Sequence, residues 1–303
     1  MIPKFPKFKK IEPTDKIDAE IFTQRLLPYS DFNFVSLWSW DIHGKVRLSE
    51  LNGNLVVRFI DYLSGEPFYS FLGENKINET IDVLLKHSID EGLPAELKLI
   101  PEDAALLADK EKFEVREDRD NFDYVYSIEE LKNMEGKKFQ KKRNQISNFL
   151  KQYPDANAAI LNLEDPKIYD SIISLYEKWI TLKLSKEDSF ESHEEMMLKR
   201  LLSATKHFKL LGVGIFVENK MIAFFLNELT ESEHVIAHAS KIDAEFIGVN
   251  SYLMKKNAEI LYSFDKKLFN YEQDLGLQNL RDAKSRFRPT LFFKQYCLTY
   301  RNA

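Results

Sequence analysis

Two carboxylates near the end of the chain have a spacing that could support acid–base chemistry. Residues 269–290 read FNYEQDLGLQNLRDAKSRFRPT, and a strand is predicted over Leu268–Gln273, before the turn at Gly276. Glu272 and Asp274 lie two residues apart, so an extended, pleated backbone would point both carboxylates to the same side. Such a pair could bind an ammonium group or accept a proton from a nucleophile.

Cationic side chains follow directly. A short charged helix is predicted over Gln278–Phe287, and Arg281, Lys284 and Arg288 recur at helical spacing, which would place them on one face. The sequence thus predicts acid and base around one turn after a strand, where α/β sheets often place their chemistry. The alternative interpretation is an ordinary strand beside a solvated, salt-bridged helix.

The middle of the chain contains a basic segment, Gly136–Tyr153, in which no Asp or Glu occurs. Apolar residues recur there at helical spacing, which predicts a helix over residues 137–153 with one core face and one cationic face. A cationic face in a chain of net negative charge suits an anionic partner, such as phosphate, the tRNA backbone or an anionic lipid headgroup. We assign Lys141, Lys142 and Arg143 to anion binding, with a solvated helix face as the alternative.

A histidine pair lies on the strand predicted over His234–Lys241. His234, Ile236 and His238 would share one face of that strand. Two His at this spacing can ligate a metal, but the sequence indicates no third ligand, so no metal site is predicted. His238 is instead a candidate acid–base group, with a structural histidine as the alternative.

Size and composition limit the remaining possibilities. The 303 residues are 44% hydrophobic and 13% aromatic, which excludes a disordered chain and suits two domains. The net charge of −5 means that any basic patch must be local. The single cysteine, Cys297, excludes a disulfide framework and is expected in the core. No secretory signal or membrane span is recognised, so we expect a cytoplasmic protein with at most peripheral membrane contact.

The order of predicted elements suggests two mixed halves. Alternating runs on either side of Asn52-Gly53-Asn54 predict a β-hairpin in the first half. In the second half, three successive strands over Lys209–Glu218, Met221–Glu228 and His234–Lys241 precede a helix over Asn250–Ser263. We predict domains over residues 1–130 and 131–303.

This order resembles the GNAT N-acyltransferase fold. The segments GKKFQKKRNQISNFLKQYP and NYEQDLGLQNLRDAKSRFRPT are similar to those of an uncharacterised bacterial family related to the catalytic, C-terminal domain of phosphatidylglycerol lysyltransferases. More distantly, they resemble the Fem peptidoglycan aminoacyltransferases. The resemblance extends from about Phe22 to Tyr300. It implies an α+β chain of two tandem GNAT-like domains, with mixed, mostly antiparallel sheets flanked by helices.

The resemblance also implies where the site would lie. In a GNAT fold, the strand before the glycine loop splays from the strand after the helix, here His234–Lys241 and Leu268–Asp274. Backbone N–H groups near Ala239 and Ser240 would face the oxyanion, so the expected catalytic set is Glu272, Asp274, His238 and Ser240.

The glycine loop of CoA-dependent relatives corresponds to Glu245–Asn250, with Gly248 and Asn250 expected at the phosphates. Glu245 brings a negative charge to that loop, which disfavours CoA in the ordinary mode. An acyl-CoA and an aminoacyl-tRNA are nevertheless both candidate donors.

The expected function is transfer of an aminoacyl or acyl group onto an amine, lipid or peptide acceptor. The candidate anion-binding residues are those of the basic segment and of the glycine loop, together with Arg281, Lys284 and Arg288. A different class remains open, namely a non-catalytic module that binds tRNA or another anionic ligand on the same scaffold.

Overall fold

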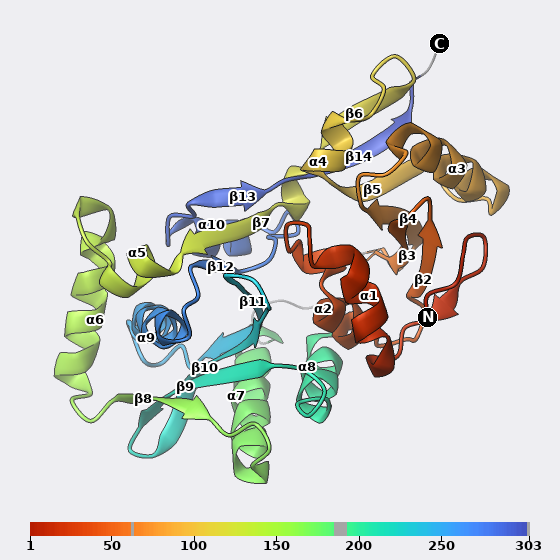
Figure 1. Ribbon diagram of the computed structural model, residues 1–303. Helices are drawn as coiled ribbons and strands as arrows, with labels where there is room; N and C mark the ends of the chain where they lie inside the picture. Colours follow the sequence, from red (N-terminus) through yellow and green to blue (C-terminus); the bar gives the residue numbers. More distant parts are fainter. Residues whose placement is uncertain (62–63, 185–192, 302–303) are drawn as a thin grey trace. The chain divides into compact units, whose positions relative to one another are not determined.

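The computed structural model describes residues 1–61, 64–184 and 193–301 (Figure 1). The chain forms two compact units. The first consists of Met1–Tyr124, Gln273–Asp282 and Phe292–Ala303, and the second of Val125–Glu272 and Ala283–Leu291. The predicted domains, 1–130 and 131–303, place the boundary later and leave the two returning segments in the second domain. Residues 295–300 return through strand pairing, and Asp274 returns through hydrogen bonds from Arg119 and Tyr124. Local sequence periodicity reveals neither kind of contact.

The first unit is built on a seven-stranded sheet in which β4 and β5 are the parallel neighbours. In spatial order its strands are β1 (Lys9–Lys10), β2 (Arg47–Leu51), β3 (Asn54–Ile60), β4 (Pro67–Leu72), β5 (Glu96–Pro101), β14 (Gln295–Tyr300) and β6 (Phe113–Glu117). The predicted hairpin is confirmed as β2–β3. Its turn residues Asn52 and Gly53 both have positive φ, 56° and 84°, as tight hairpins require.

The last strand of the chain completes this first sheet. β14 pairs antiparallel with both β5 and β6, and Figure 1 shows it in blue between them. The segment before β14 forms a separate short strand, β13 (Leu291–Phe293), which belongs to the second sheet. Helices α3 (Ile77–Asp90) and α4 (Glu102–Leu106) share a core with this sheet, and the fully buried Ile81, Leu84 and Leu85 of α3 belong to it. The unit also contains α1 (Lys16–Thr23) and α2 (Phe34–Trp40).

The second unit contains the other seven-stranded sheet. In spatial order its strands are β13, β7 (Asp123–Ser127), β12 (Leu268–Asn270), β11 (His234–Ile242), β10 (Lys220–Leu229), β9 (Leu210–Val217) and β8 (Asn157–Leu161). β11 and β12 are parallel, whereas β12–β7, β10–β11, β9–β10 and β8–β9 are antiparallel. The prediction of an α+β chain with mixed, mostly antiparallel sheets is confirmed.

Helix α9 (Val249–Ser263) is largely buried and contacts α5 (Ile128–Asn133) and α6 (Gln140–Gln152). The basic segment forms a short 3₁₀ turn, Lys137–Phe139, followed by α6, which confirms the predicted helix. Ile146 and Phe149 are its buried residues. The remaining helices of this part of the chain are α7 (Pro166–Leu184), α8 (Glu194–Ser203) and α10 (Gln278–Ser285), whose last residues fall in the second unit. Among the described helices, none has the length and apolarity needed to cross a bilayer.

Candidate functional site

Strands β11 and β12 pair over a short distance and then separate. Their parallel register runs only from His234 to Ile236 on β11, opposite Leu268 to Asn270 on β12. β12 ends there, while β11 continues to Ile242. The separation lies where the sequence predicted the splayed strands, and the side chains beyond it are the candidates for chemistry.

His238 lies in a β-bulge just beyond the last strand pair. In the β10–β11 register, Leu226 faces Ala239 and Asn227 faces Ala237, which leaves His238 as the extra residue. Bulges redirect a side chain and are frequent beside active sites. Here the bulge coincides with a fully buried imidazole, whose side chain is 0% exposed.

Two carboxylates flank this imidazole. Nε2 of His238 lies 3.3 Å from Oε2 of Glu228 on β10, and Nδ1 lies 3.6 Å from Oε1 of Glu272. Burial alone would lower the pKa of His238, but its interactions with Glu228 and Glu272 outweigh burial and raise the pKa to about 9. The imidazole is therefore protonated at neutral pH. His238, Glu228 and Glu272 are hereafter called the histidine trio.

Glu272 has two features that are typical of functional positions. Its φ of 56° lies in the left-handed region, which is strained for a residue other than glycine. Its Oε1 atom is buried and, apart from the ion pair with Nδ1 of His238 at 3.6 Å, has no hydrogen-bond partner among the described residues. Buried polar atoms are rarely left without a partner, so this oxygen is a candidate acceptor for a substrate group. The described residues contain no cluster of three His, Cys, Asp or Glu suited to a metal.

Ser240 and Tyr271 lie on the two separating segments beside the histidine trio. Their hydroxyl groups are 2.7 Å apart, and burial raises the pKa of Tyr271. Lys284 donates to the backbone carbonyl of Tyr271 at 2.5 Å and is itself buried. The structure thus brings the predicted residues His238, Ser240 and Glu272 into one region. Lys284, which was predicted to bind an anion, directs its ammonium group to a backbone carbonyl.

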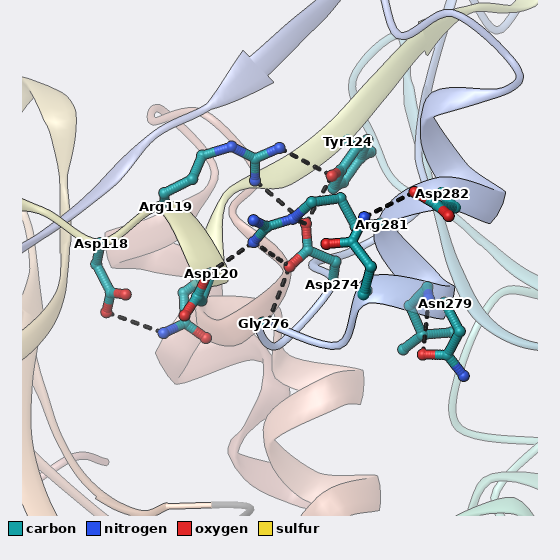
Figure 2. Close-up of polar contacts among 12 residues, drawn as sticks. Asp118, Arg119, Asp120, Tyr124, Asp274, Gly276, Asn279, Arg281 and Asp282 are labelled. Atoms are coloured by element: carbon teal, nitrogen blue, oxygen red, sulfur yellow. Dashed lines mark hydrogen bonds and ion pairs between the residues drawn. The ribbon is translucent and has the colours of Figure 1, made fainter.

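Asp274 belongs to a different cluster, shown in Figure 2. Its side chain is 0% exposed. It accepts hydrogen bonds from Nε (3.0 Å) and Nη2 (2.8 Å) of Arg281, Nη1 of Arg119 (3.2 Å), the Tyr124 hydroxyl (2.6 Å) and the Gly276 N–H (2.9 Å). These contacts satisfy the carboxylate inside the first unit. They favour a structural role for Asp274, and its catalytic role stays a prediction.

The expected alignment of Glu272 with Asp274 is wrong for a simple reason. The strand predicted to reach Gln273 ends at Asn270, whose side-chain oxygen accepts the Glu272 N–H at 2.9 Å. Beyond the strand the alternation of side chains no longer holds. Glu272 contacts His238, whereas Asp274 binds arginines.

The predicted common face of Arg281, Lys284 and Arg288 is also wrong. α10 ends at Ser285, and Arg288 lies beyond it with a φ of 60°. Arg281 uses its charge on Asp274 and on Asp120, which lies 2.7 Å away (Figure 2). Arg288 is exposed, and its anion binding stays a prediction.

The predicted cations of α6 have different environments. Arg143 donates to the carbonyl oxygens of Met134 (2.5 Å) and Gly136 (2.8 Å), just after the end of α5, so it stabilises that helix terminus. Lys141 is exposed to solvent.

Lys142 is half-buried, and its Nζ lies 3.9 Å from the centre of the Phe287 ring. Burial, together with the positive charges of Arg286 and Lys141, lowers the pKa of Lys142 to about 8.

The turn before α9 is shaped by packing. Gly248 has a φ of 95°, and a Cβ at this position would lie 2.6 Å from the carbonyl oxygen of Gln145 in α6. Glycine is therefore required by the close approach of α6, independently of any phosphate. Glu245 forms an ion pair with Lys178. Phosphate binding by Gly248 and Asn250 stays a prediction.

Sequence reasoning missed Glu228 and Tyr271. Glu228 ends a correctly predicted strand, but its proximity to His238 depends on the bulge, which has no sequence signature here. Tyr271 lies next to the predicted Glu272, and only the early end of β12 reveals that it faces Ser240.

Comparison with known proteins identifies the family. Residues 24–299 match the family model described as phosphatidylglycerol lysyltransferase, C-terminal. An uncharacterised protein of Mycoplasmoides gallisepticum is 25% identical over 176 residues, which are 57% of this chain and 54% of that protein. The chain thus spans about half the length of the curated relative that it matches.

Solved structures share the fold. A conserved protein of unknown function from Bacteroides thetaiotaomicron has a TM-score of 0.84 at 24% identity, covering 99% of this chain and 100% of that one. L-PGS from Bacillus licheniformis has a TM-score of 0.65 at 13% identity, with 100% and 95% covered. A GNAT-family acetyltransferase from Colwellia psychrerythraea has a TM-score of 0.50 at 8% identity, with 98% and 100% covered. The fold is thus GNAT-like, and the chain belongs to the family of phosphatidylglycerol lysyltransferase C-terminal domains.

Proposed function

We propose that this chain transfers an aminoacyl group from aminoacyl-tRNA onto an amine, lipid or peptide acceptor. Family and fold support acyl transfer in general. The observation that carries the finer proposal is the histidine trio, in which the buried Oε1 of Glu272 has no hydrogen-bond partner among the described residues.

The buried oxygen of Glu272 favours a substrate that bears an ammonium group. Apart from the ion pair with Nδ1 of His238 at 3.6 Å, Oε1 of Glu272 has no hydrogen-bond partner among the described residues. The α-ammonium group of an aminoacyl ester, or an amine acceptor, would donate a hydrogen bond to this oxygen.

Glu272 would also accept and return the proton that moves during the reaction. The acceptor's N–H or O–H bond breaks as its nitrogen or oxygen bonds to the ester carbonyl carbon, and Glu272 takes the proton. The ester bond to the tRNA ribose then breaks, and the ribose oxygen receives a proton from Glu272. His238, already protonated, holds the carboxylate in place. We assign the oxyanion to backbone N–H groups of the bulge at Ala239 and Ser240.

The glycine turn supports aminoacyl-tRNA over acyl-CoA as the donor. Gly248 packs against the α6 backbone at Gln145, and Glu245 adds a negative charge to the same turn. The Glu245 charge opposes a pyrophosphate at this helix terminus, where CoA-dependent relatives would hold it, and the contact with Gln145 explains the glycine without a phosphate.

A transfer assay tests the proposal. Purified protein is incubated with radiolabelled aminoacyl-tRNA pools and with labelled acyl-CoA, each with amine, lipid and peptide acceptors. We expect transfer from an aminoacyl-tRNA, reduced by about 100-fold or more in Glu272→Gln, because the variant loses both the proton acceptor and the charge. Glu231→Gln is the matched control, since Glu231 is 77% exposed and pairs with Lys209. Absence of transfer from every donor, or full activity in Glu272→Gln, would contradict the proposal.

The alternative, a non-catalytic binding module, is favoured by one observation. The His238 side chain is 0% exposed, as a purely structural histidine often is. Such a module would bind RNA or another anion in the same assay mixtures without turnover.

A further inference from the structure

Helix α1 presents two large aliphatic side chains to solvent. Ile17 and Ile21 are 76% and 61% exposed, and they lie four residues apart, so they share one face of the helix. Elsewhere α1 contacts α2 and β3, and Ala19 is buried (Figure 1). Single exposed apolar residues are common on protein surfaces, but two on successive turns form a continuous patch of the kind that a partner covers.

Opposite charges lie at the two ends of this patch. Arg25 follows Ile21 by four residues and continues the same face, because the backbone at the end of α1 is still helical. Arg25 is exposed, and among the described residues no carboxylate lies within ion-pairing distance of it. Glu12 precedes the helix and is 65% exposed. Its neighbour Lys9 is 3.8 Å away and lies closer to Asp15, at 2.6 Å.

Glu12, Ile17, Ile21 and Arg25, which we call the α1 face, are arranged symmetrically along the chain. The midpoint of the two isoleucines is residue 19, and the midpoint of Glu12 and Arg25 lies half a residue earlier. Two copies of α1 packed antiparallel about this point would place Ile17 of one copy against Ile21 of the other. The same arrangement would place Glu12 of each copy near Arg25 of the other, so the face is complementary to itself.

The charges beside the isoleucines favour a second copy over a lipid surface. Helices that lie on a membrane carry Lys and Arg on their polar face. α1 carries Asp18 and Glu20 next to its isoleucines. Asp18 pairs with the amino-terminal ammonium group and Glu20 with Lys16, so both charges are neutralised within the chain. Such flanks attract anionic lipid weakly and allow another copy to approach without strong repulsion.

We infer that the α1 face is a contact between two copies of this chain related by a twofold axis. The inference goes beyond the proposed transfer reaction, because the α1 face belongs to the first unit and the histidine trio to the second. The contact is small, since α1 has eight residues and is about 12 Å long. Its area is below that of a permanent dimer, so the dimer forms reversibly at high protein concentration.

Sedimentation equilibrium tests this inference at protein concentrations from about 10 μM to about 1 mM, where small interfaces dissociate. We expect the weight-average mass of the wild type to rise from that of a monomer toward that of a dimer. Ile17→Ser/Ile21→Ser should raise the dimer Kd about tenfold or more, because the contact loses its apolar centre. The matched control is Leu106→Ser/Leu107→Ser, which changes two leucines of the same unit that are 61% and 57% exposed. Its Kd should stay within about twofold of the wild type.

A charge exchange tests the antiparallel arrangement itself. Glu12→Lys and Arg25→Glu each place like charges at both ends of the contact, so each variant alone should dimerise about tenfold more weakly. In an equimolar mixture of the two variants, every positive end of the first variant meets a negative end of the second. The mixed dimer should therefore return to within about threefold of the wild-type Kd.

Four results would overturn the inference. The first is a wild type that stays monomeric over the whole range, and the second is a dimer that Ile17→Ser/Ile21→Ser leaves intact. The third is a mixture of the charge variants that dimerises no better than either variant alone. The fourth is a monomeric wild type that binds phosphatidylglycerol vesicles and loses this binding in Ile17→Ser/Ile21→Ser, which would assign the α1 face to a lipid surface.

Discussion

Replacing Asp274 by asparagine tests whether this carboxylate is part of the scaffold. The side chain is 0% exposed and accepts hydrogen bonds from Arg119, Tyr124, Gly276 and, twice, Arg281 (Figure 2). Asparagine removes the charge and turns an amide N–H₂ toward one of these donors. Breaking a buried ion pair costs about 3–5 kcal/mol. Because the two guanidinium groups are 38% and 29% exposed, we discount this and expect a loss of about 2–3 kcal/mol.

The assay is urea unfolding followed by circular dichroism and by tryptophan fluorescence, so that separate transitions of the two units would be seen. Asp120→Asn is the matched control. Asp120 is 59% exposed and binds the same Arg281, so its loss should cost less than about 1 kcal/mol.

Acid titration gives a second measure of the same contacts. Burial opposes ionisation of Asp274, but hydrogen bonds from Arg281, Tyr124 and Gly276 hold its pKa below the usual range. A lowered pKa contributes stability above the unfolded value, about 3.9, and that contribution is lost as pH falls through the folded value. The wild type should therefore lose stability below about pH 4 more steeply than Asp274→Asn. A variant that keeps its stability but loses transfer would refute the structural role and restore the catalytic one.

The remaining predictions concern His238 and Gly248, both measured by urea unfolding. The raised pKa of His238, about 9, stabilises the fold fully below pH 6.5, and this contribution, on the order of 3 kcal/mol, is lost as pH rises through 9. His238→Gln should flatten this alkaline limb, and a wild type with constant stability from pH 6.5 to 9 would contradict the charged state. Gly248→Ala should cost about 2–3 kcal/mol because its Cβ would lie 2.6 Å from a backbone oxygen at a φ of 95°. Gly92→Ala, at a φ of 75° in open space, should cost only about 1 kcal/mol, and equal losses would show that packing at Gly248 is unimportant.

Local patterns in the sequence were enough to predict several elements. The Asn52-Gly53 turn specifies its hairpin because both residues readily take a positive φ. The helix of the basic segment follows from the helical spacing of Ile146 and Phe149, which the structure buries. In both cases neighbouring residues carry the information.

Distant partners explain what could not be predicted. Asp274 looked like a catalytic acid because Arg119, more than 150 residues away, leaves no local trace of the ion pair. His238 and Glu272 were recognised one by one, but Glu228 was missed because a bulge in the β10–β11 pairing brings it to the imidazole. β12 ends earlier than its apolar pattern suggests, and this moves Glu272 off the strand.

The position of β14 between β5 and β6 has a consequence for making the protein. During synthesis, the edge strand β6 cannot be joined to β5 in that sheet until residues 295–300 emerge from the ribosome. Cutting the gene after codon 130 would remove β14 from the amino-terminal fragment. The edges of β5 and β6 that pair with β14 would then be exposed, and the fragment would be prone to self-association. A minimal fragment of the first unit would instead need the carboxyl-terminal strand grafted back, for example by circular permutation.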